Sequence, residues 1–156
     1  MKKEFVMRGQ TVSRNTSASP PVLGTEILNF SGFKPGMAYR LTEFKLYPST
    51  NVNSQGAELS ASITAGKTPL DPNNPDFNDD ALIATAFLSH TPTHEEITSD
   101  VFVINDTFLI TQNLTLTVND SQNNPVNWQC KFEPVKMSGA EEAVTNYKQF
   151  AISDGS

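Results

Sequence analysis

The clearest pattern in the chain is an alternation of side-chain type over residues 107–118, TFLITQNLTLTV. Threonine dominates one parity, and the other parity carries Phe108, Ile110, Leu114, Leu116 and Val118. Because successive side chains of a β-strand point to opposite faces, this period of two predicts a strand with one apolar face. We expect this long strand to lie at the centre of an all-β domain.

Similar alternation, or a short apolar run between turn residues, predicts the remaining strands. They cover residues 3–13, 25–31, 39–47, 57–65, 82–89, 101–104 and 126–137. The segment 82–89 is apolar on both faces, so a short buried helix is the alternative there. Asn105 and Asp106 suit a tight turn, which predicts a hairpin from 101–104 into 107–118, with one continuous bulged strand as the alternative.

The segment 126–137 is the second long strand, with Val126, Trp128, Cys130 and Phe132 on one face. The polar loop 119–125 separates it from 107–118, so we expect the two strands to pair. A symmetric loop would place Leu116 opposite Trp128 and Leu114 opposite Cys130, where side chains on the same face stabilise the sheet.

The end of the chain carries the one helix signal. Ser138 and Glu141 form a capping box, and apolar residues at helical spacing follow them, which predicts a helix over residues 139–148. The tail after it holds Phe150 and Ile152 at strand spacing, and we expect it to dock on a sheet or on a partner.

The predicted fold is an antiparallel β-sandwich, jelly-roll-like with about eight strands, and one short C-terminal helix. Residues 1–21 form an N-terminal strand or arm plus a linker, residues 22–137 the sandwich, and residues 138–156 the helix and tail. A chain of 156 residues has the length of one domain.

Charge and composition exclude several classes of function. The chain has 11 Lys and Arg against 17 Asp and Glu, a net charge of -6, so it lacks the basic face that nucleic-acid binding needs. No apolar run is long enough for a signal peptide or a membrane span, which predicts synthesis in a cytoplasm and no membrane partner. The single cysteine, Cys130, excludes an internal disulfide and is expected to be a buried thiol.

No motif in the chain points to an enzyme or to a cofactor. Lys67 and Thr68 resemble the end of a phosphate loop, but Ala61 stands in place of its first glycine and Pro69 follows. The Asp- and Asn-rich loop 66–80 lacks the glycine and glutamate of an EF-hand, so an irregular calcium site is the lesser alternative to a solvated loop. Pro92 separates the two histidines and argues against a zinc site. A hydrolase built on two carboxylates is a third possibility that no spacing supports.

Five segments carry a resemblance to a known class of proteins: MRGQT, LNFSGFKPGMAYRLTEFKLYPSTN, VINDTFLITQNLTLTV, NPVNWQCKFEPVKMS and EAVTNYKQFAISDGS. Together they cover nearly half of the chain. They resemble small virion-associated proteins encoded by marine tailed bacteriophages. The resemblance contains no catalytic motif and assigns no functional residue. It implies a capsid decoration or minor structural role, accessory to the major capsid protein.

We therefore expect a virion structural protein, made in the host cytoplasm, that binds and stabilises the outer capsid lattice. Its partners would be the major capsid protein or other virion proteins, and it would act as a homo-oligomer, with a trimer favoured. Termini and long loops are the segments that most often make contacts. The candidate contact residues in them are Lys2, Lys3, Phe5, Arg8, Asp71, Asn73, Asp76, Phe77, Phe150 and Ile152.

A carbohydrate-binding or host-attachment module of a phage particle is the alternative from a different class. Trp128, Tyr39 and Tyr47 would then form an exposed row on which sugars stack. Trp128, however, lies on the apolar face of its predicted strand, which favours a place in the core.

Overall fold

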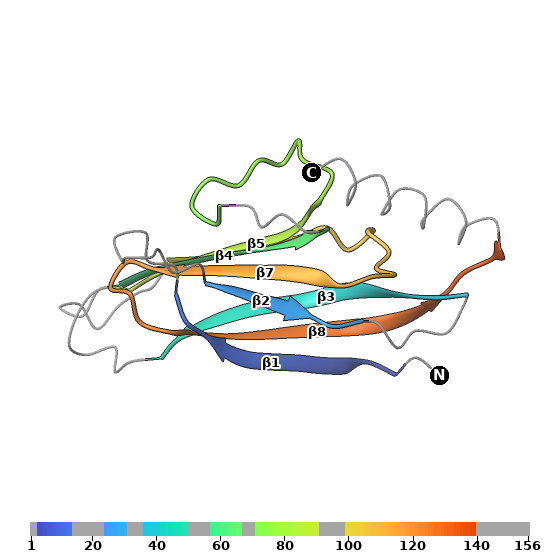
Figure 1. Ribbon diagram of the computed structural model, residues 1–156, viewed down its shortest axis with the longest axis horizontal. Coiled ribbons are helices and arrows are strands. Elements are labelled where there is room, and N and C mark those ends of the chain that lie inside the picture. Colours follow the sequence, from blue (N-terminus) through green and yellow to red (C-terminus); the bar gives the residue numbers. More distant parts are fainter. Residues whose placement is uncertain are drawn as a thin grey trace.

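The computed structural model describes residues 3–13, 24–30, 36–49, 57–66, 71–90 and 99–139. Within these ranges the chain forms eight β-strands in two antiparallel sheets that pack face to face (Figure 1). The strands are β1 (Phe5–Thr11), β2 (Thr25–Leu28), β3 (Met37–Pro48), β4 (Ala57–Ala65), β5 (Leu82–His90), β6 (Ser99–Ile104), β7 (Leu114–Asp120) and β8 (Val126–Lys136). The predicted antiparallel β-sandwich is confirmed. Residues 140–156, with most of the predicted helix and the tail, lie outside the described residues.

The strand order is that of a jelly roll with one change. One sheet has the order β1-β8-β3 and the other the order β2-β7-β4-β5-β6. The pairs β1–β8, β2–β7 and β4–β5 arise when a long hairpin of strands folds over on itself. The fourth such pair, β3–β6, is absent because β6 pairs with β5 instead. The N-terminal segment is therefore a strand of the sandwich and not a free arm.

The predicted pairing of the two long strands is wrong, because β7 and β8 belong to different sheets. Leu116 lies between Glu26 and Ile63, and Trp128 lies between Gly9 and Leu46. In a hairpin the two apolar faces would point the same way and would both need a second sheet to cover them. In facing sheets they cover each other across the core.

The long strand predicted over residues 107–118 is also wrong in its first half. Strand β7 begins only at Leu114, and the Asn105 side chain accepts hydrogen bonds from the Thr107 backbone N–H (3.2 Å) and hydroxyl (2.7 Å), closing a turn. Ile110 then forms an isolated bridge with Tyr39 in the other sheet. Residues 105–113 therefore form neither the predicted hairpin nor a continuous bulged strand, and they link the two sheets.

An aromatic cluster fills one part of the core. The Phe132 ring lies 4.9 Å from the Phe30 ring and 5.5 Å from the Phe5 ring, measured between centroids, and Tyr39 packs edge-on against Phe5 at 5.3 Å. Such offset and edge-on pairs add to the free energy of burial. Phe5, on β1, is half-buried against this core.

The threonine row of β7 lies on the outer face of the five-stranded sheet, and this part of the face is covered. Thr115 and Thr117 are 3% and 4% exposed, and Ser60 on β4 is equally buried. Residues 71–81 lie over this face in Figure 1, and the Ser60 hydroxyl donates a hydrogen bond of 2.6 Å to Asn73 Oδ1. Strand β4 is therefore buried on both faces, since its outward Ser60, Ser62 and Thr64 are 5%, 0% and 0% exposed, and over Ser60 this loop adds a partial third layer.

Trp128 fixes the position of β1 on the sheet. Its indole N–H donates a buried hydrogen bond of 2.8 Å to Thr11 Oγ1. Gly9 packs against the same ring. A Cβ added at Gly9 would lie 3.0 Å from Cζ2 and 3.3 Å from Cε2 of Trp128. The hydrogen bond to Thr11 holds the ring, so it cannot yield to a larger residue.

This packing predicts that Gly9→Ala destabilises the protein. We expect a loss of about 1 kcal/mol in the free energy of unfolding, typical of mild overpacking in a core. Urea denaturation measures it, with Gly139→Ala as the control because nothing lies within 4 Å of the position of its Cβ. Equal stability of the Gly9→Ala variant and the original protein would contradict this account of the β1 contact.

Candidate functional site

The charged side chains divide unequally between the two sheets. The six Lys and Arg of the described residues all lie on or beside the three-stranded sheet: Lys3, Arg8, Arg40, Lys45, Lys131 and Lys136. Three carboxylates accompany them. The five-stranded sheet and its connections carry, in the described ranges, no Lys or Arg and nine carboxylates: Glu26, Glu58, Asp71, Asp76, Asp79, Asp80, Asp100, Asp106 and Asp120. Over the described residues, the side of the three-stranded sheet is therefore cationic and the side of the five-stranded sheet is acidic.

Two rows of polar side chains cross the outer face of the three-stranded sheet. Arg8, Gln129 and Lys45 stand directly opposite one another on the three strands. The second polar row, separated from the first by the row that contains Trp128, consists of Gln10, Asn127 and Tyr47. Paired residues share a face, and these rows alternate with the row that contains the inward-pointing Trp128, so both rows point outward. We call this surface the cationic face.

A shallow groove runs between the two rows. It is lined by Arg8, Gly9, Lys45, Leu46, Tyr47, Asn127, Trp128 and Gln129. Its floor is the row Gly9, Trp128 and Leu46, where the glycine has no side chain and the other two side chains are buried in the core. The groove therefore exposes backbone, amides and two cations, with the Tyr47 ring 67% exposed at its side.

The hydrogen bonds of the groove leave its two cations available. Asn127 is held by Gln10, which donates to its Oδ1 at 3.0 Å. Elsewhere on the sheet Arg40 pairs with a carboxylate at 3.0 Å and Lys131 with another at 3.6 Å. Arg8 and Lys45, in contrast, form no ion pair with any described residue. Lys45 Nζ lies instead 4.8 Å from the centroid of the Phe102 ring, a cation–π contact to β6.

The acidic loop, residues 71–81, uses its carboxylates to shape its own backbone. Asp71 Oδ1 accepts a hydrogen bond from the Asn73 N–H, and Asp76 Oδ1 accepts one from the Asn78 N–H, both at 2.9 Å. Asp79 does the same for the N–H two residues on. These are Asx turns, which stabilise an irregular loop without a metal ion. In the described part of the chain, no three His, Cys, Asp or Glu converge as metal ligands.

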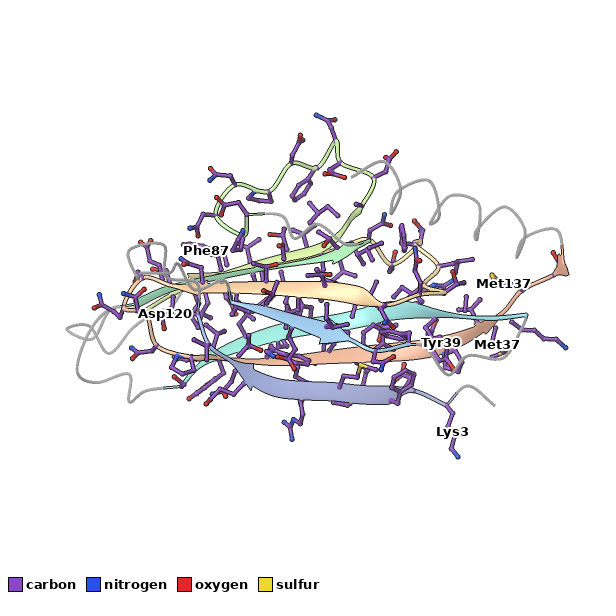
Figure 2. All side chains as sticks on the ribbon, viewed as in Figure 1. Lys3, Met37, Tyr39, Phe87, Asp120 and Met137 are labelled. Carbon is purple, nitrogen blue, oxygen red and sulfur yellow. The ribbon has the colours of Figure 1, made fainter. Side chains whose placement is uncertain are left out.

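Four exposed apolar side chains gather beside the acidic loop, and we call them the apolar patch: Phe77, Phe87, Val101 and Val103. Phe87 pairs directly with Val101 across β5 and β6, so both lie on the outer face of the five-stranded sheet. Phe77 extends from the loop towards a small hollow that Val103 and the start of β5 also line. Figure 2 shows Phe87 and Lys3 on opposite sides of the sandwich.

The predicted contact residues differ in exposure and in the contacts that they make within the chain. Lys3, Arg8 and Phe77 are exposed, whereas Phe5 packs in the core and Asp71, Asn73 and Asp76 hold the loop together. Lys2, Phe150 and Ile152 lie outside the described residues.

Sequence reasoning missed the groove residues Lys45, Asn127 and Gln129, whereas it named Tyr47 as a candidate for sugar stacking. Each of these residues lies at a polar position of an alternating strand, which the sequence does show. The sequence around them does not show that the two strands, β3 and β8, are neighbours. It also missed Phe87, Val101 and Val103. Their strands carry apolar side chains on both faces, which predicts that both faces are buried, and only the position of β5 and β6 at one end of the sheet shows that one face is exposed.

Two buried titratable groups lie away from these surfaces. Burial raises the pKa of the Cys130 thiol far above its usual range, so this thiol stays protonated and unreactive. Burial also raises the pKa of the Asp120 carboxyl at the end of β7, although a hydrogen bond of 2.7 Å from the Gln122 N–H opposes the rise. The predicted buried thiol is confirmed.

No protein-family model and no curated protein sequence matches this chain. Among the described residues there is no helix of the length and apolarity that a membrane crossing requires.

Asp120 generates a prediction about pH. Its pKa is raised in the folded protein, so its contribution to stability is present below the unfolded pKa and is lost as pH rises through the folded pKa. Asp120→Asn cannot ionise and keeps the oxygen that accepts from Gln122. We expect the stability of this variant relative to the original protein to increase from pH 3 to pH 7, measured by urea denaturation. The exposed Asp106→Asn is the control, and a difference that stays constant with pH for Asp120→Asn would contradict the prediction.

Proposed function

We propose that this protein is a structural protein of a bacteriophage particle, a decoration protein that binds and stabilises the outer capsid lattice in multiple copies. The observation that carries the proposal is the division of charge between the two sides of the sandwich. Opposite charges on opposite faces orient a molecule on a charged surface and set which side meets each neighbour. A two-sided molecule of this kind is suited to forming an ordered layer.

The chemistry of the side chains supports a role in binding. The one thiol is buried and protonated, and three of the four carboxylates of the acidic loop, those of Asp71, Asp76 and Asp79, accept backbone hydrogen bonds in its Asx turns. What the molecule offers to a partner is surface: the cationic face with Arg8 and Lys45, and the apolar patch beside the acidic loop. The resemblance of five segments to virion-associated proteins supplies the class of particle, and the partners would be the major capsid protein or other virion proteins.

The direct test is the protein content of purified particles. The particles are purified from infected cells in which the phage genome expresses this chain. We expect quantitative mass spectrometry of these particles to find many copies of the chain per particle. Charge-assisted attachment further predicts that washing particles with about 1 M salt, where the screening length is about 3 Å, releases more of the protein than washing at 0.1 M. Particles that lack the chain would refute the proposal.

A carbohydrate-binding role is the second candidate, and one observation favours it. Tyr47 presents an exposed ring at the side of a groove that holds the amides of Asn127 and Gln129, a combination that sugars can stack on and hydrogen-bond to. Trp128 is in the core and Tyr39 belongs to the aromatic cluster, so the three-ring platform is reduced to one ring.

Titration with polysaccharides from the host surface tests this candidate. Binding that Tyr47→Ala weakens by roughly fivefold, equivalent to about 1 kcal/mol for a lost aromatic contact, would support it. Tyr47→Phe, which keeps the ring, is the matched control. Absence of binding by the original protein to any of these polysaccharides would exclude it.

A further inference from the structure

Exposed apolar side chains concentrate on the two oppositely charged sides of the molecule. Among the described residues eight large apolar side chains are exposed, and four of them form the apolar patch. Two others, Val6 and Tyr47, lie on the cationic face. Clusters of exposed apolar groups ringed by polar residues mark surfaces that bind proteins. Each side of the sandwich therefore has the composition of half an interface.

The two sides are also complementary in charge. The apolar patch adjoins the acidic loop with Asp76, Asp79 and Asp80, and the five-stranded sheet carries no Lys or Arg among its described residues. The cationic face offers Arg8 and Lys45, which have no carboxylate partner in the described part of the chain. Complementary potentials of this kind fix the orientation of two partners and exclude wrong ones.

The geometry prevents these two sides from meeting within one molecule. They are the outer faces of two sheets packed against each other, so they point in opposite directions (Figure 1). A second copy, however, can place its acidic side on the cationic face of the first. Such a contact is heterologous, because it joins two different surfaces, and it builds a closed ring or an open stack according to the rotation between copies.

We infer that copies of this chain associate head to tail, with the cationic face around Arg8, Lys45 and Tyr47 docked on the apolar patch and acidic loop of the next copy. The inference rests on the proposed function in one respect, that a decoration layer needs contacts between copies. It identifies the partner of the cationic face as a neighbouring copy, and a ring of three copies is one closed form of the contact.

Two complementary variants test the inference in solution. Arg8→Glu with Lys45→Glu inactivates the cationic face, and Phe77→Lys with Val101→Lys inactivates the apolar patch. All four side chains are exposed, although Lys45→Glu removes the contact between Lys45 and the Phe102 ring. Arg8→Glu alone is a second variant that leaves the contact between Lys45 and Phe102 in place. Lys3→Glu with Lys136→Glu is the control, with the same change of charge at the other end of the same sheet.

Sedimentation equilibrium of the full chain gives the readout. We expect the original protein to associate with increasing concentration, and less strongly at 0.5 M than at 0.1 M salt. Each double variant should be monomeric alone, and their equimolar mixture should form a 1:1 heterodimer that grows no further, because one intact half-interface remains on each partner. Arg8→Glu alone should weaken association, and the control should associate as the original protein does.

Three results would overturn the inference: a monomeric original protein, self-association by either double variant, or a mixture that stays monomeric. A symmetric contact between identical surfaces predicts the second result, self-association by one of the double variants, and not the heterodimer. The test is independent of the particle experiment. Absence of the chain from particles refutes the decoration role and leaves self-association intact, whereas a monomer that is nevertheless found on particles refutes only the head-to-tail contact.

Discussion

The arrangement of the chain depends on the mutual burial of the apolar faces of β7 and β8. Leu114, Leu116 and Val118 on one strand and Trp128, Cys130 and Phe132 on the other are nearly or fully inaccessible to water. The short connection between them, which includes Asn123 at a positive φ of 60°, carries the chain from one sheet to the other. Because the apolar faces of two consecutive strands cover each other, each strand must recruit its sheet neighbours from distant parts of the chain. Those neighbours are β2 and β4 for β7, and β1 and β3 for β8.

This recruitment produces the two-sided surface. Strands β1, β3 and β8 each alternate apolar side chains, which face the core, with polar or charged ones, and the sheet places their cations on one outer face. The cations are far apart in the sequence, at positions such as Arg8, Lys45 and Lys131, so they form no run of basic residues from which a cationic surface could be predicted. The acidic residues collect on the other side for a different reason. There Asp and Asn residues close the turns of a long loop, so their number reflects the need for turns as well as surface charge.

The edge of the five-stranded sheet departs most from a jelly roll, and it also carries the exposed apolar side chains. In the rolled hairpin β6 would pair with β3, but here it extends the opposite sheet beyond β5. Phe102 on β6 still meets β3 through the contact with Lys45, while Val101 and Val103 face outward. An apolar edge is a liability that proteins cover, charge or use. Its position beside the acidic loop and opposite the cationic face fits use as a surface between copies.

The sequence by itself determined where most strands lie and which faces they bury, because alternation is a local property that follows from the geometry of one strand. Strands close to those predicted are found at β1, β3, β4, β5 and β8, and the one thiol is buried as expected. Tertiary structure alone decided which strands are neighbours. Only the second half of the predicted strand 107–118 formed, as β7, while Ile110 was placed in a bridge to Tyr39. The tertiary fold also separated Leu116 from Trp128, packed Phe5 against the core and placed the Asp71 carboxylate in a turn of the loop. It also brought Arg8, Gln129 and Lys45 into one row. Which strands pair depends on how the apolar faces of whole sheets bury each other. No single stretch of the sequence contains that information.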